Sequence, residues 1–530
     1  MTSTDTTTKT QATSRFARQT GTVAGATVIS RVFGLVREQV IAYMFGAGAL
    51  TDVFVAAFRI PNLLRDLFAE GAFSAAFIPS FTGVLTKEGR QAAFDLLNRV
   101  LSVFVPAIGL ICLLGIIFTP QLAQLISGGV EQTPGKLELL IVMARWMFPF
   151  LLLVSLAAAF MGALNAMGQF GIPALAPAGF NVGVILGAVW LSRYSDPPLL
   201  ALAWGVLLGG ALQWGIQIVL AHQLGFRFGV RSGWRDSEVG KILKLMLPAL
   251  IGIAAIQVNV FAITRFAWTL GDGPVAYLNF AFRILFLPLG VFAVAAATVG
   301  LPRLSGYVAA GDNEAVRDTY TQGVRTVLYL VVPTAVGLIV LAEPICGALF
   351  QRGRFTASDT SATALALQYY SLGLPTMALI RVTAPLFYAH QDTRTPALCG
   401  VVAVAANLIG MSLLVGPMGF GGLALSVAIS SVIQITLLWI VATHRYGSVG
   451  VLSHLIEWIK LAGLSLVCVA AGWWAMNHIS VLPTGMGLII KAGTGILVAA
   501  VLYLGITWMF GYRNLGGARR VTTSGGEQTK

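Results

Sequence analysis

The chain has 530 residues, of which 57% are hydrophobic and only 10% are charged, and its formal net charge is +13. A soluble globular protein carries about 25% charged residues, so this composition excludes a string of soluble domains. It indicates a polytopic membrane protein, because a spanning helix uses about 20 apolar residues and no large soluble domain fits between the apolar runs.

The first predicted element is a disordered cytoplasmic tail over residues 1–20, which are rich in threonine and serine. This stretch is not expected to be a signal peptide. The apolar segment that follows it is about 25 residues long and has no convincing cleavage site, unlike the short apolar core of a secretory signal.

Apolar runs separated by charges, Pro/Gly clusters and polar turns predict fourteen spanning helices and an all-α fold. Because fourteen is even, both termini lie on one side. Twenty of the 34 lysines and arginines fall in loops and tails on that side, so the positive-inside rule predicts cytoplasmic termini. Opposite-side loops hold Lys136, Arg193, Arg352, Arg354 and Lys491. The predicted spans are 21–45, 51–84, 92–119, 137–163, 172–193, 198–222, 241–270, 274–304, 317–348, 360–389, 395–416, 421–443, 455–477 and 484–511.

An internal repeat appears when the chain is shifted against itself by 221–227 residues. The tetrapeptide Ala-Phe-Arg-Ile at 57–60 recurs at 281–284, and Pro-Ala-Leu at 173–175 recurs at 396–398. An even number of spans in each copy makes the repeats parallel, an arrangement that places a substrate site at their interface and works by alternating access. The predicted parts are an N-lobe at 21–223, a cytoplasmic linker at 224–240, a C-lobe at 241–447, two further spans at 448–511 and a cytoplasmic tail at 512–530.

Nine cations are assigned to the membrane interior, the other lysines and arginines being counted with the loops and tails, and all nine are arginines. Arginine stays protonated when buried and presents a planar fork that matches phosphate or carboxylate oxygens, so this choice favours binding of an oxyanion over proton relay. We expect Arg31, Arg37 and Arg283, which lie deep in their spans, to line a central hydrophilic cleft. Snorkelling to the headgroups is an open alternative for others. The nine arginines are Arg31, Arg37, Arg59, Arg65, Arg145, Arg265, Arg283, Arg325 and Arg381.

Acidic residues gather in the first two spans. Glu38 directly follows Arg37, and the spacing of Asp52, Arg59, Asp66 and Glu70 would place these four residues on one face of a straight helix. Pro61 interrupts that register by removing a backbone hydrogen bond. Structural ion pairing and a gating or substrate role both remain open for this group.

Enzyme signatures are missing from the sequence: it has no HExxH, P-loop, GxSxG or acidic DxD motif. The four cysteines lie in apolar runs without metal-ligand spacing and are interpreted as buried hydrophobic residues. We therefore expect no catalysis, metal, cofactor or nucleic-acid partner.

Several segments closely resemble the MurJ (MviN) family of lipid II flippases, in the MOP exporter superfamily. In the first lobe they are the runs at 30–38, 45–52 and 58–74, and in the second the runs at 349–355 and 384–396. The resemblance implies a bacterial inner-membrane protein that moves the undecaprenyl-diphosphate-linked peptidoglycan precursor from the cytoplasmic to the periplasmic leaflet for cell-wall synthesis. Lipid II and membrane lipids are the implied partners, and protein partners are left open.

The resemblance also implies residue roles. Some members hold sodium with carboxylates in spans seven and eleven; here those spans contain Asn259 and Asn407 but no acid, so a sodium site is not expected. The last two spans would shelter the polyprenyl tail. The implied substrate-binding residues are Arg31, Arg37, Arg65 and Arg283, and the implied gating or supporting residues are Glu38, Asp52, Arg59 and Glu70.

Three alternatives to this hypothesis remain open on the sequence alone. The substrate could be another polyprenyl-linked oligosaccharide, or the chain could be a MATE-like drug/cation antiporter, which would need a membrane carboxylate or sodium site. A membrane-embedded glycosyltransferase or phosphatase is disfavoured by the missing catalytic motifs. Fixed arginine charges favour the membrane potential over sodium or protons as the energy source.

Overall fold

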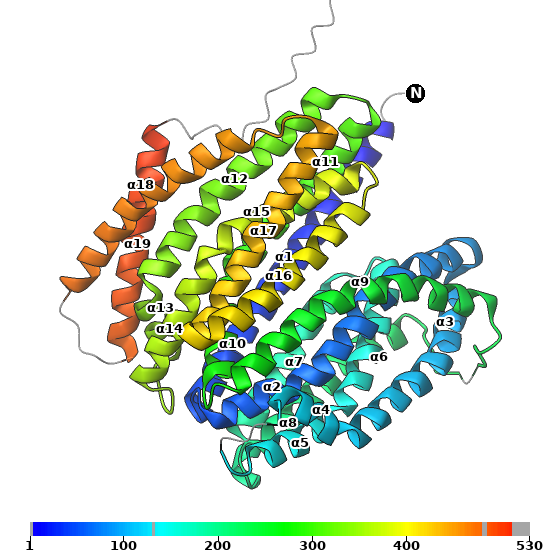
Figure 1. Ribbon diagram of the computed structural model, residues 1–530. Helices are drawn as coiled ribbons and strands as arrows, with labels where there is room; N and C mark the ends of the chain where they lie inside the picture. The colour runs from blue at the N-terminus through cyan, green and yellow to red at the C-terminus, as the bar shows by residue number, and fades with distance from the viewer. Residues whose placement is uncertain (1–3, 130–132, 230, 480–484, 511–530) are drawn as a thin grey trace, which may run out of the picture. The chain divides into compact units, whose positions relative to one another are not determined.

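The apolar runs of the sequence form long helices, and no strand occurs among the described residues (Figure 1). The computed structural model describes residues 4–129, 133–229, 231–479 and 485–510. Side chains are described outside 4–24, 69–70, 247–249, 251–253 and 255–256. The tail predicted at 512–530 lies outside the described residues.

The first half of the chain contains nine α-helices, a π-helical segment and a 3-10 turn within the described residues. These are α1 (Thr4–Phe45), α2 (Ala49–Arg65), the π-helix η1 (Asp66–Gly71), α3 (Ala72–Ile117), α4 (Thr119–Ser127), α5 (Lys136–Met147), α6 (Pro149–Ala166), α7 (Gly171–Val189), the 3-10 turn η2 (Leu191–Tyr194), α8 (Leu200–Gln223) and α9 (Ser237–Trp268).

The second half continues in the same way over the described residues. Its elements are α10 (Pro274–Pro288), the π-helix η3 (Leu289–Ala293), α11 (Val294–Ala309), α12 (Asn313–Val340), α13 (Ala342–Phe350), α14 (Ala357–Leu372), α15 (Leu374–Ala389), α16 (Arg394–Met418), α17 (Phe420–Tyr446), α18 (Val451–Asn477) and α19 (Gly485–Met509).

Each of the fourteen predicted spans falls on helical elements, and several spans cover two or three consecutive elements. Within α3, Gly89 has a non-helical φ of 85°, which separates the spans predicted at 51–84 and 92–119. By length and hydropathy alone, ten helical segments among the described residues are fit to cross a membrane, or eleven if the bent pair α14 and α15 is one span. A multi-spanning helical fold is therefore confirmed, and the exact count of fourteen stays a prediction.

The N-terminal segment differs from the expected disordered tail. Helix α1 begins at Thr4, so residues 4–20 are helical. The physical reason is visible in the sequence: residues 4–20 contain neither proline nor glycine to end the helix that the following apolar run propagates.

The two copies of the Ala-Phe-Arg-Ile sequence have the same local structure. Arg59 lies on α2, which runs into the π-helix η1, and Arg283 lies on α10, which runs into the π-helix η3. Isolated π-helical turns are rare and often occur at functional sites. Their presence after both copies is consistent with the internal repeat.

Contacts divide the chain into two compact units, and the division differs from the repeat boundaries at 21–223 and 241–447, which stay a prediction. The first unit consists of residues 1–283, 349–366 and 404–426 and the second of residues 284–348, 367–403 and 427–530.

In the first unit, α7 and α8 pack with their backbones in contact. A Cβ added at Gly183 would lie 2.2 Å from the Gly209 nitrogen, so only glycine permits this approach. A second core forms where α3 meets α6 and α9, with the stacked rings of Phe73, Phe77 and Phe104 among its buried residues.

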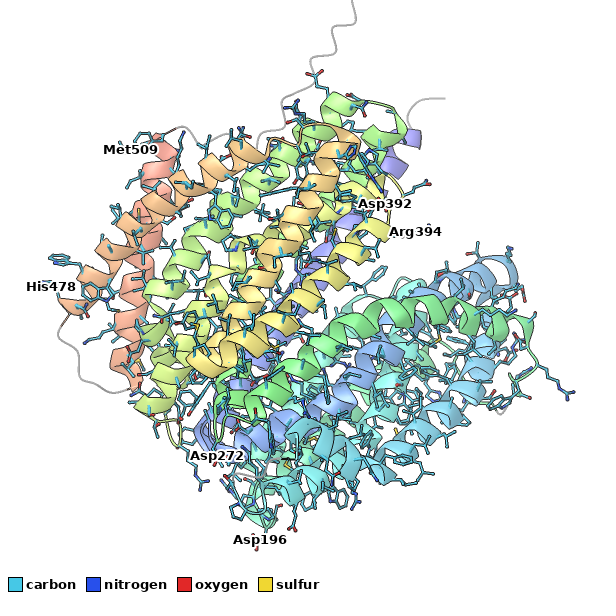
Figure 2. The ribbon with its side chains drawn as sticks, viewed as in Figure 1. Asp196, Asp272, Asp392, Arg394, His478 and Met509 are labelled. Atoms are coloured by element: carbon cyan, nitrogen blue, oxygen red, sulfur yellow. The ribbon has the colours of Figure 1, made fainter. Side chains whose placement is uncertain are left out.

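In the second unit, α18 and α19 lie next to each other (Figure 1), with Gly472 against Gly495. Helix α18 also packs on α12, where Arg325 pairs with Glu457 at 3.0 Å. Asp392 lies in the turn between α15 and α16, and Arg394 is the first residue of α16 (Figure 2). Asp392 accepts a hydrogen bond from Arg445 at 2.5 Å, which ties this turn to the end of α17.

Candidate functional site

The arginine site is a cluster of Arg37, Glu38, Arg59 and Arg283 in the first unit. Arg37 Nη2 donates to Glu38 Oε1 at 2.5 Å, and Arg283 Nε lies 3.2 Å from the same oxygen. Glu38 is 4% exposed, whereas 48% of the Arg283 side chain is accessible. A buried carboxylate therefore bridges two guanidinium groups from α1 and α10.

The remaining contacts fix the orientation of Arg37. Its Nη1 donates to Asn181 Oδ1 at 3.0 Å, and its guanidinium lies 5.6 Å from the ring centre of Phe180, close enough for a cation–π contact. Asn181 and Phe180 both come from α7, which packs against α1. The two terminal nitrogens of Arg37 thus donate to different partners, one to Asn181 on α7 and one to Glu38.

A cavity of about 40 Å³ lies at this cluster. Among its lining residues are three arginines and one carboxylate, so the charge of the lining is positive. The site can accept a further anion, and the paired donors of guanidinium groups suit a phosphate group in particular. The lining residues are Arg37, Glu38, Phe54, Val55, Phe58, Arg59, Asn62, Phe180, Val184, Asn279 and Arg283.

Two other predicted substrate-binding residues, Arg31 and Arg65, are not among the residues that line this cavity. Arg31 is exposed on α1, six residues before Arg37. Arg65 donates from Nε and Nη2 to Asp66 Oδ1, at 3.1 and 2.8 Å, and the other oxygen of Asp66 accepts from Gln257 at 2.9 Å. The side chain of Glu70 lies outside the described part of the chain.

Asp52 belongs to a second cluster, the Lys136 network, made of Asp52, Lys136 and Asp272. Asp52 is fully buried on α2. Lys136 Nζ, at the first residue of α5, lies 3.1 Å from Asp52 Oδ2 and 2.8 Å from Asp272 Oδ1. It also lies 4.5 Å from the ring centre of Trp268. A single buried ammonium thus joins two carboxylates.

Asp52 also caps the N-terminus of α10. Its two oxygens accept from the backbone nitrogens of Gly273, at 2.7 Å, and Ala276, at 2.8 Å. The first amides of a helix have no partner within the helix, and a carboxylate there is stabilised by the helix dipole. The Lys136 network therefore connects α2, α5 and the start of α10, the helix that carries Arg283.

Sequence reasoning missed the role of Lys136, which it placed in a loop on the membrane side opposite the termini. The only signal available was a lone lysine at the start of an apolar run, near the same predicted membrane surface as Asp52. Asn181 and Gln257 were also missed, because uncharged amides in apolar helices carry no distinguishing pattern.

Asp272 lies outside the spanning helices, in the turn before α10 (Figure 2), and it titrates differently from an ordinary aspartate. Partial burial raises its pKa, but hydrogen bonds from Lys136 and Thr133 and the charge of Lys136 bring the pKa below the ordinary value. A carboxyl with a lowered pKa stabilises the folded state above the pKa of the unfolded chain, and this stabilisation is lost as pH falls through the lowered pKa.

We therefore expect Asp272→Asn to lower the melting temperature of the purified protein at neutral pH. The difference from the parent should shrink as the pH falls below about 4. Glu138→Gln, which removes an exposed acid from α5, is the matched control. If the melting-temperature difference between Asp272→Asn and the parent stayed constant down to acid pH, the lowered pKa of Asp272 would be contradicted.

The two asparagines of spans seven and eleven, where a sodium site was not expected, are hydrogen-bonded to each other. Asn407 on α16 donates a hydrogen bond to Asn259 on α9. Among the residues whose placement is described, no group of three His, Cys, Asp or Glu side chains could hold a metal ion.

Comparison with known proteins gives one consistent result. The family model described as Lipid II flippase MurJ matches residues 41–492. A Haemophilus influenzae protein named "Probable lipid II flippase MurJ" is 37% identical over 426 residues, covering 78% of this chain and 83% of its own length. A Burkholderia cenocepacia protein named "Lipid II flippase MurJ" is 32% identical, covering 93% and 97%.

Solved structures show the same fold. A structure described as lipid II flippase MurJ in an inward closed conformation aligns with a TM-score of 0.77 at 24% identity, covering 93% of this chain and 99% of that one. An inward-facing multidrug resistance transporter of the MATE family, in the MOP superfamily, aligns with a TM-score of 0.65 at 14% identity, covering 79% and 95%.

Proposed function

The chain belongs to the MurJ family of lipid II flippases, and from this premise we propose that it carries lipid II from the cytoplasmic to the periplasmic leaflet by alternating access. It is a multi-pass membrane protein of a bacterial transporter family. The finer points proposed here are an inner-membrane location, cytoplasmic termini and transport without catalysis, for cell-wall synthesis.

The observation that carries this proposal is the bridge from Arg37 and Arg283 to Glu38. Two guanidinium groups that converge on one oxyanion in a positively charged cavity would bind the diphosphate of the substrate. Glu38 occupies an anion position between them and acts as an internal counter-ion. The diphosphate displaces Glu38 on binding, and Glu38 competes for the arginines again when the lipid leaves.

Alternating access also needs an element that holds one side closed. We assign this closing element to the Lys136 network, because its three side chains connect the first turn of α2 and the first residue of α5 to the start of α10. Breaking the contacts of Asp52 with Gly273 and Ala276 frees that end of α10. We assign Asp52 and Lys136 to this gate on the periplasmic side. Arg31, Arg65 and Glu70 are proposed to contact the substrate or support the gate at another stage of transport.

The membrane potential is the proposed driving force. The cluster holds permanently charged arginines, and one elementary charge that crosses the membrane field gains about 2.3 kcal/mol per 100 mV. Transport that persisted after collapse of the potential, and stopped on removal of sodium alone, would refute this assignment.

Helices α18 and α19 are proposed to shelter the prenyl tail. They lie outside the repeat, and their exposed side chains include Leu466, Val467 and Leu497, each more than half accessible. Tyr503 of α19 donates a hydrogen bond to the backbone oxygen of Tyr329 on α12, at 2.8 Å, which holds α19 against α12.

Truncation near residue 448 should therefore abolish transport of the long-chain lipid. The measurement is complementation of a strain depleted of its own flippase, with membrane insertion of the truncated chain verified by immunoblot. Normal growth supported by a stably inserted truncated chain would rule out an essential groove.

The experiment that tests the function is depletion of this protein in its own host, with the leaflet distribution of lipid II as the readout. We expect lipid II to accumulate in the cytoplasmic leaflet and to return to the periplasmic leaflet when expression is restored. An unchanged distribution after depletion, in a host with no second flippase, would contradict the proposed function.

A further inference from the structure

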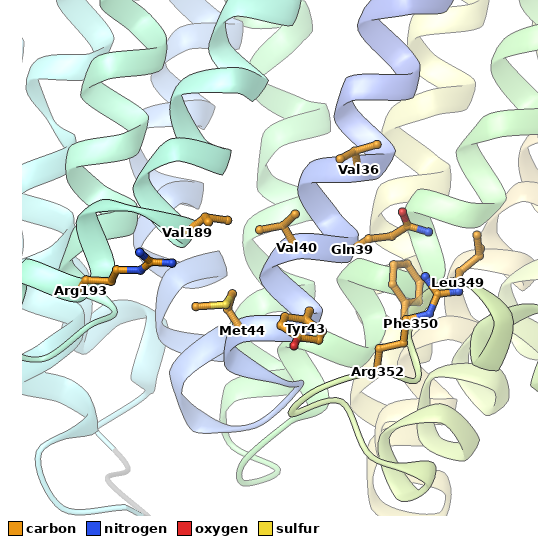
Figure 3. Close-up of a pocket in the computed structure, with 10 residues that line it drawn as sticks. All are labelled: Val36, Gln39, Val40, Tyr43, Met44, Val189, Arg193, Leu349, Phe350 and Arg352. Carbon is orange, nitrogen blue, oxygen red and sulfur yellow. The ribbon is translucent and has the colours of Figure 1, made fainter. Parts of the chain in front are cut away.

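A second and larger cavity, of about 420 Å³, lies on the other side of α1 from Glu38. We call it the α1 trough. Its floor and walls are Val36, Gln39, Val40, Tyr43, Met44, Val189, Arg193, Leu349, Phe350 and Arg352 (Figure 3). The floor positions recur every three or four residues on one face of α1, and a helix turns 100° per residue, so Glu38 points away from the trough.

The trough has an apolar floor between two cationic walls. In Figure 3, Arg193 lies on one side of the α1 residues, and Phe350 and Arg352 lie on the other. No acidic residue contributes to the lining. The floor is open, since 38% of Val36 and 55% of Tyr43 are accessible. This combination of two fixed positive charges and an accessible apolar surface suits an amphiphile with an anionic head.

The depth of these groups in the membrane agrees with that chemistry. The trough begins at the C-terminal end of α1, and Arg193 and Arg352 lie in the segments that follow the ends of α7 and α13. Val36 lies about two helical turns further in than Tyr43. Because the ends of a spanning helix lie near the headgroups, we expect the two arginines at headgroup depth and the valines of the floor at the depth of acyl chains.

The wall that carries Arg352 is firmly attached to α1. The Arg354 nitrogen donates to the Tyr43 oxygen at 2.9 Å, and a Cβ on Gly353 would lie 2.4 Å from that same oxygen. Phe350 packs on Phe280 of α10, with ring centres 4.9 Å apart. These contacts hold the wall in place, so the trough does not depend on a ligand for its shape.

We propose that the α1 trough binds a glycerophospholipid with a net negative headgroup, held by its phosphate between Arg193 and Arg352 and by an acyl chain along Val36 and Val40. This lipid is a resident of the periplasmic leaflet and is not the transported substrate. The assignment of this lipid to the periplasmic leaflet rests on the proposed orientation of the chain. Its binding to the trough does not depend on the proposed transport function. Because the trough uses the reverse face of α1, the bound lipid supports the helix that positions Arg37 and Glu38.

The test is native mass spectrometry of the purified full chain, titrated with phosphatidylglycerol. We expect the double variant R193Q/R352Q to bind this lipid at least roughly tenfold more weakly, since each basic residue near the membrane surface contributes about fivefold to the affinity for an anionic lipid. The control R145Q/K491Q removes the same charge outside the lining and should bind like the parent. Val40→Trp, which fills the floor, should also weaken binding while the melting temperature stays unchanged.

Two competitors identify the source of the phosphate. Glycerol 1-phosphate should not displace phosphatidylglycerol at equal concentration, because it lacks the acyl chains. A polyprenyl diphosphate should not displace it either, because its own site is at Arg37 and Arg283. The proposal is overturned if either competitor displaces the lipid or if R193Q/R352Q binds it like the parent. Since the readout is binding alone, a failure of the proposed transport function would leave these results unaffected.

Discussion

Replacement of Arg37 or Arg283 by lysine should abolish most of the transport, although the charge is retained. Arg37 uses two separate nitrogens, one on Glu38 and one on Asn181, and lysine has only a single ammonium on a flexible stem. A hydrogen bond to a charged group contributes about 1.5–3 kcal/mol, so each variant should lose roughly ten- to hundredfold in transport rate. The measurement is complementation of a flippase-depleted strain at native expression level.

Alanine at either position should be no better than lysine, and Arg145→Lys, on an exposed face of α5, is the matched control. Growth like the parent with both lysine variants would show that charge alone suffices and would refute bidentate binding. Growth like the parent with both alanine variants would show that Arg37 and Arg283 do not form the diphosphate site.

Replacement of Lys136 by methionine should have the largest effect on stability. Methionine fills a similar volume but leaves Asp52, which is fully buried, without its cation. Removal of one partner of a buried ion pair costs about 3–5 kcal/mol, because the other charge remains buried and uncompensated. We expect a large fall in the melting temperature of the purified protein.

The double variant K136M/D52N should recover part of that loss, because asparagine carries no charge and its side-chain oxygen can still accept a hydrogen bond from the start of α10. A coupling free energy of about 1 kcal/mol or more between the two positions is expected. Lys491→Met is the control for loss of a lysine elsewhere. Strictly additive effects of the two substitutions would show that Lys136 does not neutralise Asp52.

Much of the fold could be predicted because membrane insertion imposes a simple rule on the sequence. Long apolar runs must be helical, since no water satisfies their backbone groups, and a break such as Gly89 leaves a visible polar interruption. The start of α1 was predicted less well. Composition suggested a tail at 1–20, but the absence of helix-breaking residues lets the helix extend back to Thr4.

The candidate site could be predicted only in part. Arg37, Glu38 and Arg283 stand out as charges in apolar runs, and the structure brings all three together. The straight-helix register placed Asp52 with Asp66, but α2 passes into a π-helix at Asp66, and the two acids have different partners. Lys136 and Asn181 reach their partners through tertiary packing over 84 and 144 residues of sequence, which no local pattern records.

The most direct test of the central claim is the equilibrium affinity of the purified full chain for a polyprenyl diphosphate, compared between the parent, Glu38→Gln and Arg283→Lys. If Glu38 is the counter-ion that the diphosphate displaces, Glu38→Gln should bind roughly tenfold more tightly, because it loses one charge-assisted competitor. Arg283→Lys should bind more weakly by a similar factor. Equal affinities for all three proteins, or weaker binding by Glu38→Gln, would contradict the account.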